Sequence, residues 1–326
     1  MIRVHLALLT VQLLFGLWPV AGAMVLGVMP PAALIGFRLL LGAPLLVLAT
    51  GVLFRPLPSG GDLLRLALLA ALGISINQLL FAEGLHRAGP VNASLSILLV
   101  PAVSVLVARA LRLERLDARR VFGVVIALIG AAILLEVERF DPSSRRMIGN
   151  LMLVVNASVY ASYLVLARPV IARVGSVATV AWIFLFGMLE ALPFTWTAVW
   201  AVSWLSLPSW TYGALAFVLF GATLTTYLLN AYALGRIESS VVATYVYLQP
   251  VVASVAAYFL LDDLPTGRSL VAGATIVVGV VIVAARRGGS FLSWPRGHVA
   301  SSGTHDGGAP RRETTGDPPV PGRHGA

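Results

Sequence analysis

The chain has 326 residues, of which 58% are hydrophobic and only 11% are charged, and its formal net charge is +9. A soluble globular domain contains about 45–50% apolar and about 25% charged residues, so this chain must expose apolar surface to lipid. It contains no cysteine, which excludes disulfides and thiolate chemistry, and no lysine, which excludes a Walker-type phosphate loop and Schiff-base catalysis.

Apolar runs long enough to cross a bilayer, which takes about 20 residues each, follow one another along most of the chain. The first five lie at 4–25, 32–54, 63–83, 91–111 and 119–136. The second five lie at 148–167, 177–200, 210–234, 240–261 and 268–285. We therefore expect an all-α integral membrane protein with ten transmembrane helices.

The composition changes abruptly after Arg287. Residues 288–326 are rich in Gly, Pro, Ser, Thr and Arg and contain almost no aliphatic side chains. Such a segment cannot bury enough apolar surface to fold, so we expect a disordered tail.

The arginines predict the orientation in the membrane. If the N-terminus is cytoplasmic, the inside segments carry Arg3, Arg55, Arg65, Arg112, Arg115, Arg119, Arg120, Arg168, Arg173, Arg236, Arg286 and Arg287. The outside loops then carry only Arg87, Arg139, Arg145, Arg146 and Arg268. Because basic residues favour the cytoplasmic side, both termini are expected there. The same placement explains the positive charge without a nucleic-acid partner.

The two halves of the chain resemble each other. At an offset of 149 residues, residues of one kind coincide: Pro101 with Pro250, Glu114 with Asp263, and Gly130 with Gly279. Nearer the start of each half the offset is 145. Since each half has an odd number of spans, repeats at 1–137 and 147–286 must lie in opposite orientations. Inverted repeats are common in alternating-access carriers; a duplication with a purely structural role is the alternative.

Several motifs recur in an ordered spacing: Leu34 to Leu39 around Arg38, the proline-centred runs at Pro101 and Pro250, and the acidic turns Leu113-Glu114 and Asp262-Asp263. In this order they resemble the EamA-type proteins of the drug/metabolite transporter superfamily over about 1–285. One departure is Phe15-Gly16, which stands where the family usually has Trp-Gly. The resemblance implies secondary transport, often efflux, of metabolites or drugs across the bacterial inner membrane.

Arg38 and Glu190 are ionisable residues inside apolar runs, where a charge costs a few kcal/mol, so both are functional candidates. Arg38 could attract an anionic, carboxylate-bearing substrate, or tie its helix to a neighbouring helix end or carboxylate. Glu190 could carry a proton, because desolvation favours the neutral form of a carboxyl group, or it could sit neutral against a packing partner.

Neutral polar side chains recur on the runs that line the central path in the resembled family. The substrate-cavity candidates, besides Arg38, are Gln12, Asn77, Gln78, Tyr160, Tyr163, Tyr227, Asn230, Tyr247 and Gln249. Each could instead join helices or anchor the interface. Pro101 and Pro250 free backbone carbonyls and can shape their helices. Glycines at 123, 130, 273 and 279 are typical of close helix packing.

The leading hypothesis is a gradient-driven secondary transporter, expected to export small metabolites or drugs by alternating access. A membrane-embedded sensor or interaction protein without transport is the alternative. An enzyme is not expected, because every aspartate is predicted in a loop or the tail and every histidine at a span end or in the tail. The same placement predicts no metal site, and no cofactor is expected. The expected partners are a small-molecule substrate, the lipid bilayer and protons as a candidate coupling ion, with monomer and homodimer left open.

Overall fold

The computed structural model describes residues 2–113, 117–135, 141, 143–234 and 245–284. Within these ranges the chain is almost entirely helical and contains no strand, which confirms the expected all-α character. The expected tail at 288–326 and the repeat-matched Glu114 lie outside the described residues.

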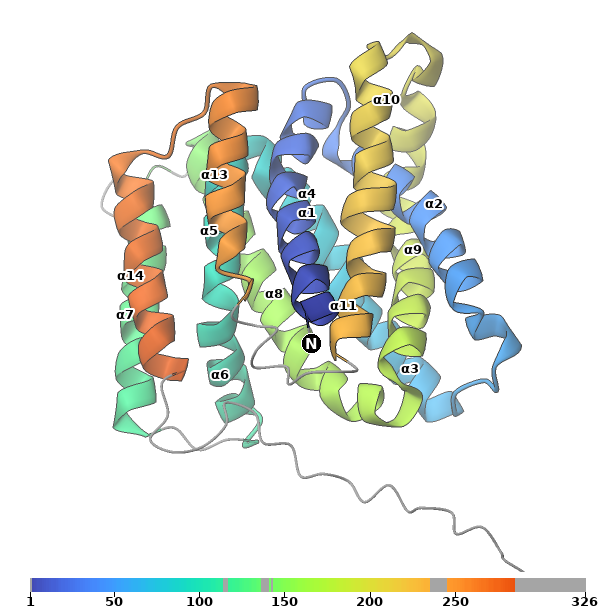
Figure 1. Ribbon diagram of the computed structural model, residues 1–326, viewed down its shortest axis with the longest axis horizontal. Coiled ribbons are helices and arrows are strands. Elements are labelled where there is room, and N and C mark those ends of the chain that lie inside the picture. Colours follow the sequence, from blue (N-terminus) through green and yellow to red (C-terminus); the bar gives the residue numbers. More distant parts are fainter. Residues whose placement is uncertain (1, 114–116, 136–140, 142, 235–244, 285–326) are drawn as a thin grey trace, which may run out of the picture. The chain divides into compact units, whose positions relative to one another are not determined.

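The first half of the chain forms a series of helices that can be followed by colour from blue to green in Figure 1. They are α1 (Ile2–Leu26), α2 (Pro31–Thr50), α3 (Gly60–Ala70), α4 (Ile76–Ala88), α5 (Pro90–Ser96), α6 (Val100–Ala110) and α7 (Ala118–Leu135). A π-helical segment, η2 (Ala71–Ser75), joins α3 to α4, and a 3-10 turn, η3 (Ile97–Leu99), joins α5 to α6. Each joined pair is one continuous span.

The second half has a similar order of elements. They are α8 (Arg145–Val174), α9 (Ser176–Ala201), α10 (Ser209–Ala216), the π-helical η6 (Phe217–Thr225), α11 (Thr226–Leu234), α13 (Leu248–Leu261) and α14 (Gly267–Ala284). The π-helical segment again interrupts the third long span of its half, between α10 and α11.

Eight helical segments of the described chain are long and apolar enough to cross a bilayer. Two more apolar helices, α13 and α14, are shorter. The ninth expected span, 240–261, begins among residues that the structure does not describe, so the total of ten remains a prediction.

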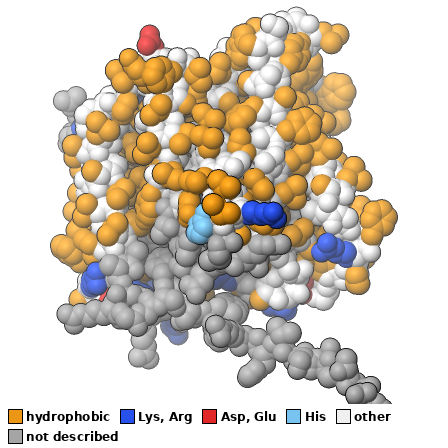
Figure 2. All heavy atoms as spheres, viewed as in Figure 1, with side chains coloured by type: hydrophobic (Ala, Val, Ile, Leu, Met, Phe, Trp, Pro, Cys, Tyr) orange, Lys and Arg blue, Asp and Glu red, His pale blue; other side chains and the backbone are white. Residues whose placement is uncertain are grey.

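Apolar side chains cover much of the face seen in Figure 2. Phe54 is 92% exposed, Phe259 76% and Trp200 70%. Soluble monomers rarely expose contiguous apolar surface on this scale. Together with the long apolar helices, this surface identifies a multi-pass membrane protein.

Helices from the first half pack mainly against helices from the second. α2 packs on α9, α4 on α8, α7 on α14, and α1 on both α11 and α13. The α7–α14 contact is visible at one side of Figure 1, where the two helices lie together.

Glycines permit the closest of these approaches. A Cβ atom added to Gly123 on α7 would lie 2.7 Å from the carbonyl oxygen of Gly279 on α14, so neither position has room for a side chain. The packing role that the sequence predicted for these glycines is confirmed, and the contact lies within one chain.

Helix α3 begins at Gly60, earlier than the predicted run at 63–83. Ser59 caps α3, because its hydroxyl oxygen accepts a 3.2 Å hydrogen bond from the backbone N–H of Asp62. Asp62 therefore lies in the first turn of α3 and is 9% exposed, whereas the sequence predicted a loop position for it.

Candidate substrate site

Arg38 on α2 is only 4% exposed and is held against the second half of the chain. Its Nε donates a 2.7 Å hydrogen bond to Thr223 Oγ1, and its Nη2 donates a 3.2 Å bond to the carbonyl oxygen of Ala222. Its guanidinium carbon lies 4.6 Å from the centroid of the Trp18 ring, a cation–π distance. Carboxylates in ion pairs within the described part of the chain contact other arginines.

The π-helical turn of η6 creates the partners of Arg38. Thr223 donates a 2.8 Å hydrogen bond to the carbonyl oxygen of Val218, five residues earlier. Its oxygen can therefore accept from Arg38 while its hydrogen is used within the helix. Such π-helical segments are frequent at functional sites, because they present backbone and side-chain groups that an α-helix would hide.

One ring of a stacked aromatic pair lies against this arginine. Trp18 on α1 stacks on Phe81 of α4 with ring centroids 5.9 Å apart. Neither ring is among the site residues predicted from the sequence, and Thr223 is not among them either. An aromatic residue in an apolar run is equally typical of an interfacial anchor, so no sequence signal distinguishes these positions.

The structure brings three of the predicted tyrosines together. Tyr160 and Tyr163 on α8 stack with centroids 5.7 Å apart, and Tyr227 on α11 makes an edge contact with Phe184 at 4.8 Å. Tyr163 belongs to an apolar cluster that includes Trp182 and Phe184 of α9, and Tyr160 and Tyr227 pack against the same cluster. Three predicted cavity residues thus gather where α8, α9 and α11 meet.

Glu190 lies on α9 and is half-buried. Its carboxylate accepts a 2.6 Å hydrogen bond from the hydroxyl of Ser75, which belongs to η2. Glu190 and Arg38 form no ion pair with each other.

Asn77 and Gln78 have different surroundings although they are adjacent on α4. Asn77 exchanges hydrogen bonds with Asn156 on α8: the Asn156 amide donates to the Asn77 carbonyl oxygen at 2.6 Å, and the reverse bond measures 3.5 Å. This pair joins two helices. Gln78 is 5% exposed, and its Oε1 has no hydrogen-bond partner among the described residues.

The remaining predicted residues lie on α1, α11 and near the start of α13. Gln249 donates a 2.6 Å hydrogen bond to the buried Gln12, which joins α13 to α1. Tyr247 is half-buried immediately before α13, and Asn230 is half-buried on α11. Arg38 forms no hydrogen bond with any of these four described residues.

The two predicted helix-shaping prolines stand near helix starts. The 3-10 turn η3 ends two residues before Pro101, which lies in the first turn of α6. Pro250 is buried in the first turn of α13. Both positions suit a residue that lacks a backbone N–H.

An ion pair joins α3 to α8 at the ends of these helices. Arg173 donates to Asp62 Oδ1 through Nη2 at 2.6 Å and through Nε at 3.1 Å. The exposed Arg65 approaches the same oxygen at 3.4 Å. This pairing could not be predicted from the sequence, because 111 residues separate its two members.

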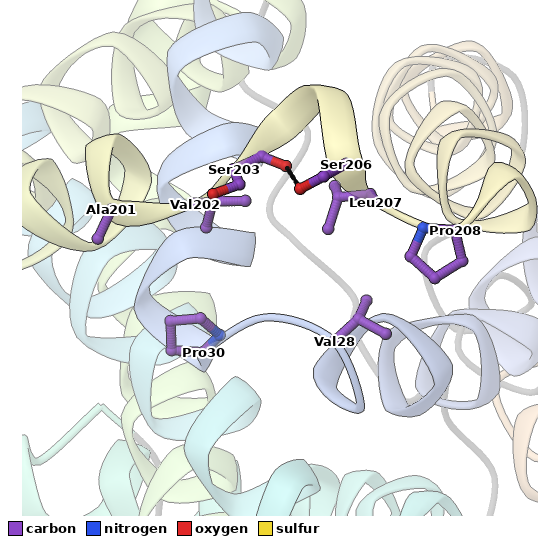
Figure 3. Close-up of a pocket in the computed structure, with 8 residues that line it drawn as sticks. All are labelled: Val28, Pro30, Ala201, Val202, Ser203, Ser206, Leu207 and Pro208. Atoms are coloured by element: carbon purple, nitrogen blue, oxygen red, sulfur yellow. Dashed lines mark hydrogen bonds between the residues drawn. The ribbon is translucent and has the colours of Figure 1, made fainter.

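An open pocket of about 440 Å³ lies between two connections, as Figure 3 shows. Val28 and Pro30, which connect α1 to α2, form one wall. Ala201, Val202, Ser203, Ser206, Leu207 and Pro208, which connect α9 to α10, form the other. None of the predicted site residues lines this pocket.

The fold and its apolar surface define a multi-pass α-helical membrane protein, and the comparisons with known proteins identify its class as a membrane transporter. The sequence model of the EamA-like transporter family matches residues 2–136 and again residues 147–285. The chain belongs to this family. The family and the names of the relatives point to a transporter rather than an enzyme.

The chain is similar to three curated relatives along most of their length. It is 27% identical over 263 residues to an uncharacterized transporter of Archaeoglobus fulgidus, covering 79% of this chain and 89% of the relative. It is 27% identical over 257 residues to a probable terminal-alkyne amino-acid exporter of Streptantibioticus cattleyicolor, covering 76% and 81%. It is 24% identical over 218 residues to the uncharacterized transporter YyaM of Bacillus subtilis, covering 66% and 71%.

A solved crystal structure whose description names no activity has a TM-score of 0.59 with this chain at 22% identity. The similarity covers 86% of this chain and 96% of the other. It supports the fold alone.

Proposed function

We propose that this protein is a secondary exporter of small metabolites or drugs in the bacterial inner membrane. Two inverted five-helix halves, 1–137 and 147–286, alternate access to a site between them, and a gradient drives the cycle. Both termini are cytoplasmic, as the distribution of arginines favours. The substrate site is formed around Arg38 and the three tyrosines, on helices of both halves.

A reciprocal exchange of hydrogen bonds between the halves carries this proposal. Arg38 on α2 bonds to a hydroxyl of η6, and Glu190 on α9 bonds to a hydroxyl of η2. α2 and α9 are the second spans of their halves, and η2 and η6 interrupt the third. Thr223 follows Ser75 by 148 residues, close to the repeat offset. Exchanging the halves therefore exchanges the elements that each contact joins, although Arg38 and Glu190 are 152 residues apart and do not occupy equivalent positions at the offset of 145.

The packing of the helices supports the same relationship. Under an exchange of halves, the contact of α4 with α8 becomes that of α11 with α1, and the contact of α1 with α13 becomes that of α8 with α6. The α2–α9 contact and the α7–α14 contact each join equivalent helices of the two halves, so the exchange leaves them unchanged. Inverted repeats generate this pattern, and substrate sites in such carriers lie where the repeats meet.

The two ends of the molecule differ in a way that alternating access requires. At the repeat offsets, Asp62 corresponds to Thr211 and Arg173 to Val28. The ion pair closes the end expected to face the cytoplasm, whereas the open pocket beside Val28 lies at the opposite end. Thr211 is buried, and its hydroxyl has no partner among the described residues. We therefore assign the arrangement to a state closed on the inside.

Glu190 is the candidate proton carrier. It lies inside a membrane span, is half-buried and is held by a hydroxyl rather than by a cation. A carboxyl group in such a setting can exchange a proton as its exposure changes during the cycle.

The name of one relative supports export and an amphipathic substrate, since that protein is named a probable terminal-alkyne amino-acid exporter.

The test is uptake of a metabolite panel into proteoliposomes, with and without a pH gradient, with protein-free vesicles as the control. Saturable uptake of at least one solute is the expected result. If the folded, reconstituted protein moves no solute, the proposal is wrong.

A further inference from the structure

The guanidinium of Arg38 is a buried cation whose contacts in the described chain are all neutral. Its partners are a hydroxyl, a backbone carbonyl and an aromatic face. These groups orient the cation without cancelling its charge. A charged side chain inside a membrane span costs a few kcal/mol and is normally paired.

The hydrogen bonds of Arg38 leave one edge of the guanidinium unused. Nε and Nη2 donate to η6, and Nη1 has no hydrogen-bond partner in the described chain. The fully buried side-chain polar atoms without a partner in the described chain are Gln78 Oε1 and Thr211 Oγ1. Nη1 is not one of them, so a part of its surface is accessible. Each terminal nitrogen carries two hydrogens, so the Nη1–Nη2 edge can still donate two parallel bonds to a carboxylate.

An aromatic pair begins at this guanidinium. The Trp18 ring lies against the guanidinium carbon, and Phe81 stacks on Trp18. Gln78 lies one helical turn before Phe81, on the same face of α4, and is a second buried polar side chain with an unpartnered atom. A cation edge, an aromatic wall and an unused amide suit an amphipathic ligand.

We propose that Arg38 binds the carboxylate of the transported substrate, and that the Trp18–Phe81 stack binds its apolar body. The substrate class is therefore an organic monoanion with an aromatic or aliphatic body. This inference rests on the proposed transport function, but it concerns binding and can be tested without transport.

The test uses purified full-length protein in lipid nanodiscs with radiolabelled phenylacetate, indole-3-acetate and hexanoate as probes. Unlabelled phenylacetate is compared with phenylacetamide and phenethylamine, which keep the aromatic ring but replace the carboxylate by a neutral or cationic group. Because a charge-assisted hydrogen bond is stronger than a neutral one, the carboxylate should displace label at about tenfold lower concentration or better. Equal displacement by the amide, or no saturable binding of any of the three carboxylates, overturns the inference.

Two variants assign the effect to Arg38. Arg38→Gln should abolish the preference for carboxylate over amide, and Arg38→Lys should keep part of it. A preference that survives in folded Arg38→Gln overturns the assignment. If Arg38→Gln does not fold, Trp18→Leu provides the test. This variant should weaken binding of all aromatic probes equally and keep the preference for carboxylate over amide. Loss of that preference in Trp18→Leu counts against the inference.

Binding and transport fail separately. A chain that binds carboxylates selectively but moves none contradicts the proposed transport and leaves the site intact. A chain that transports amides and amines as fast as carboxylates contradicts this site and leaves the transport function intact.

Discussion

Ser75 donates a 2.6 Å hydrogen bond to Glu190, and this bond joins the π-helical η2 of the first half to α9 of the second. A half-buried carboxylate in an apolar span is thus held by a hydroxyl, which can remain its partner in either protonation state. A fixed cation would have stabilised the charged form alone. The pairing suits a group that exchanges a proton.

Glu190→Gln should abolish stimulation of transport by a pH gradient while leaving exchange of substrate down its own gradient. The amide keeps the shape and hydrogen-bonding ability of the acid but cannot ionise. Proteoliposome flux measured with and without an imposed gradient checks this. Ser75→Ala is the matched control, because it removes the hydrogen bond and keeps the carboxyl group, so stimulation should persist. An unchanged response in Glu190→Gln removes Glu190 as the proton carrier.

Asp62→Asn should increase opening of the inner end, because it weakens the ion pair with Arg173 that closes α3 against α8. The natural chain contains no cysteine, so a single Ala167→Cys substitution reports on this opening without background. Ala167 is 1% exposed and lies on α8 in the same apolar cluster as Leu66 of α3. The labelling rate by a water-soluble maleimide should rise severalfold in Asp62→Asn.

The control for this experiment is Arg65→Gln. Arg65 is 60% exposed and reaches the carboxylate at only 3.4 Å, and such surface pairs contribute little. Arg173 is 44% exposed but makes two bonds, of 2.6 and 3.1 Å, to the same oxygen. Labelling in this variant should match the parent. A reversed pair, Asp62→Arg with Arg173→Asp, should restore slow labelling. If Asp62→Asn is labelled as slowly as the parent, the proposed closure is contradicted.

Much of the fold could be predicted from the sequence because hydropathy reports directly on the bilayer. Eight of the predicted apolar runs coincide with long apolar helices of the described chain. Their ends differ from the prediction where charged residues continue a helix. α8 extends from Arg145 to Val174, well beyond the predicted 148–167, because its terminal arginines lowered the local hydropathy. The π-helical segments were not predicted, since no residue pattern distinguishes them from an α-helix.

The site was predicted in part for a related reason. Arg38 and Glu190 stood out because charges are rare in apolar runs. Their partners, Thr223 and Ser75, did not, because hydroxyl side chains inside helices commonly bond to their own backbone. Only tertiary packing selects which hydroxyl meets which charge. Trp18 was missed for the same reason: its role depends on α2 and α4 lying beside it.

Gly123→Ala should destabilise the protein, because the added methyl would lie 2.7 Å from a backbone oxygen of α14, which cannot move aside as a side chain can. Overpacking of this kind costs about 1–3 kcal/mol. Thermal unfolding in detergent should show a lower Tm. The control is Gly213→Ala on α10, where nothing lies within 4 Å of the added atom, and Tm should hold or rise. Equal Tm values for parent and Gly123→Ala would contradict the α7–α14 contact.

Counterflow in proteoliposomes tests alternating access most directly. Vesicles are preloaded with an unlabelled substrate found in the uptake panel, and entry of the labelled substrate is followed without any other gradient. A carrier whose site faces one side at a time should show accelerated entry and a transient overshoot of label. Entry that is independent of the preloaded substrate, without overshoot, would contradict the alternating-access account.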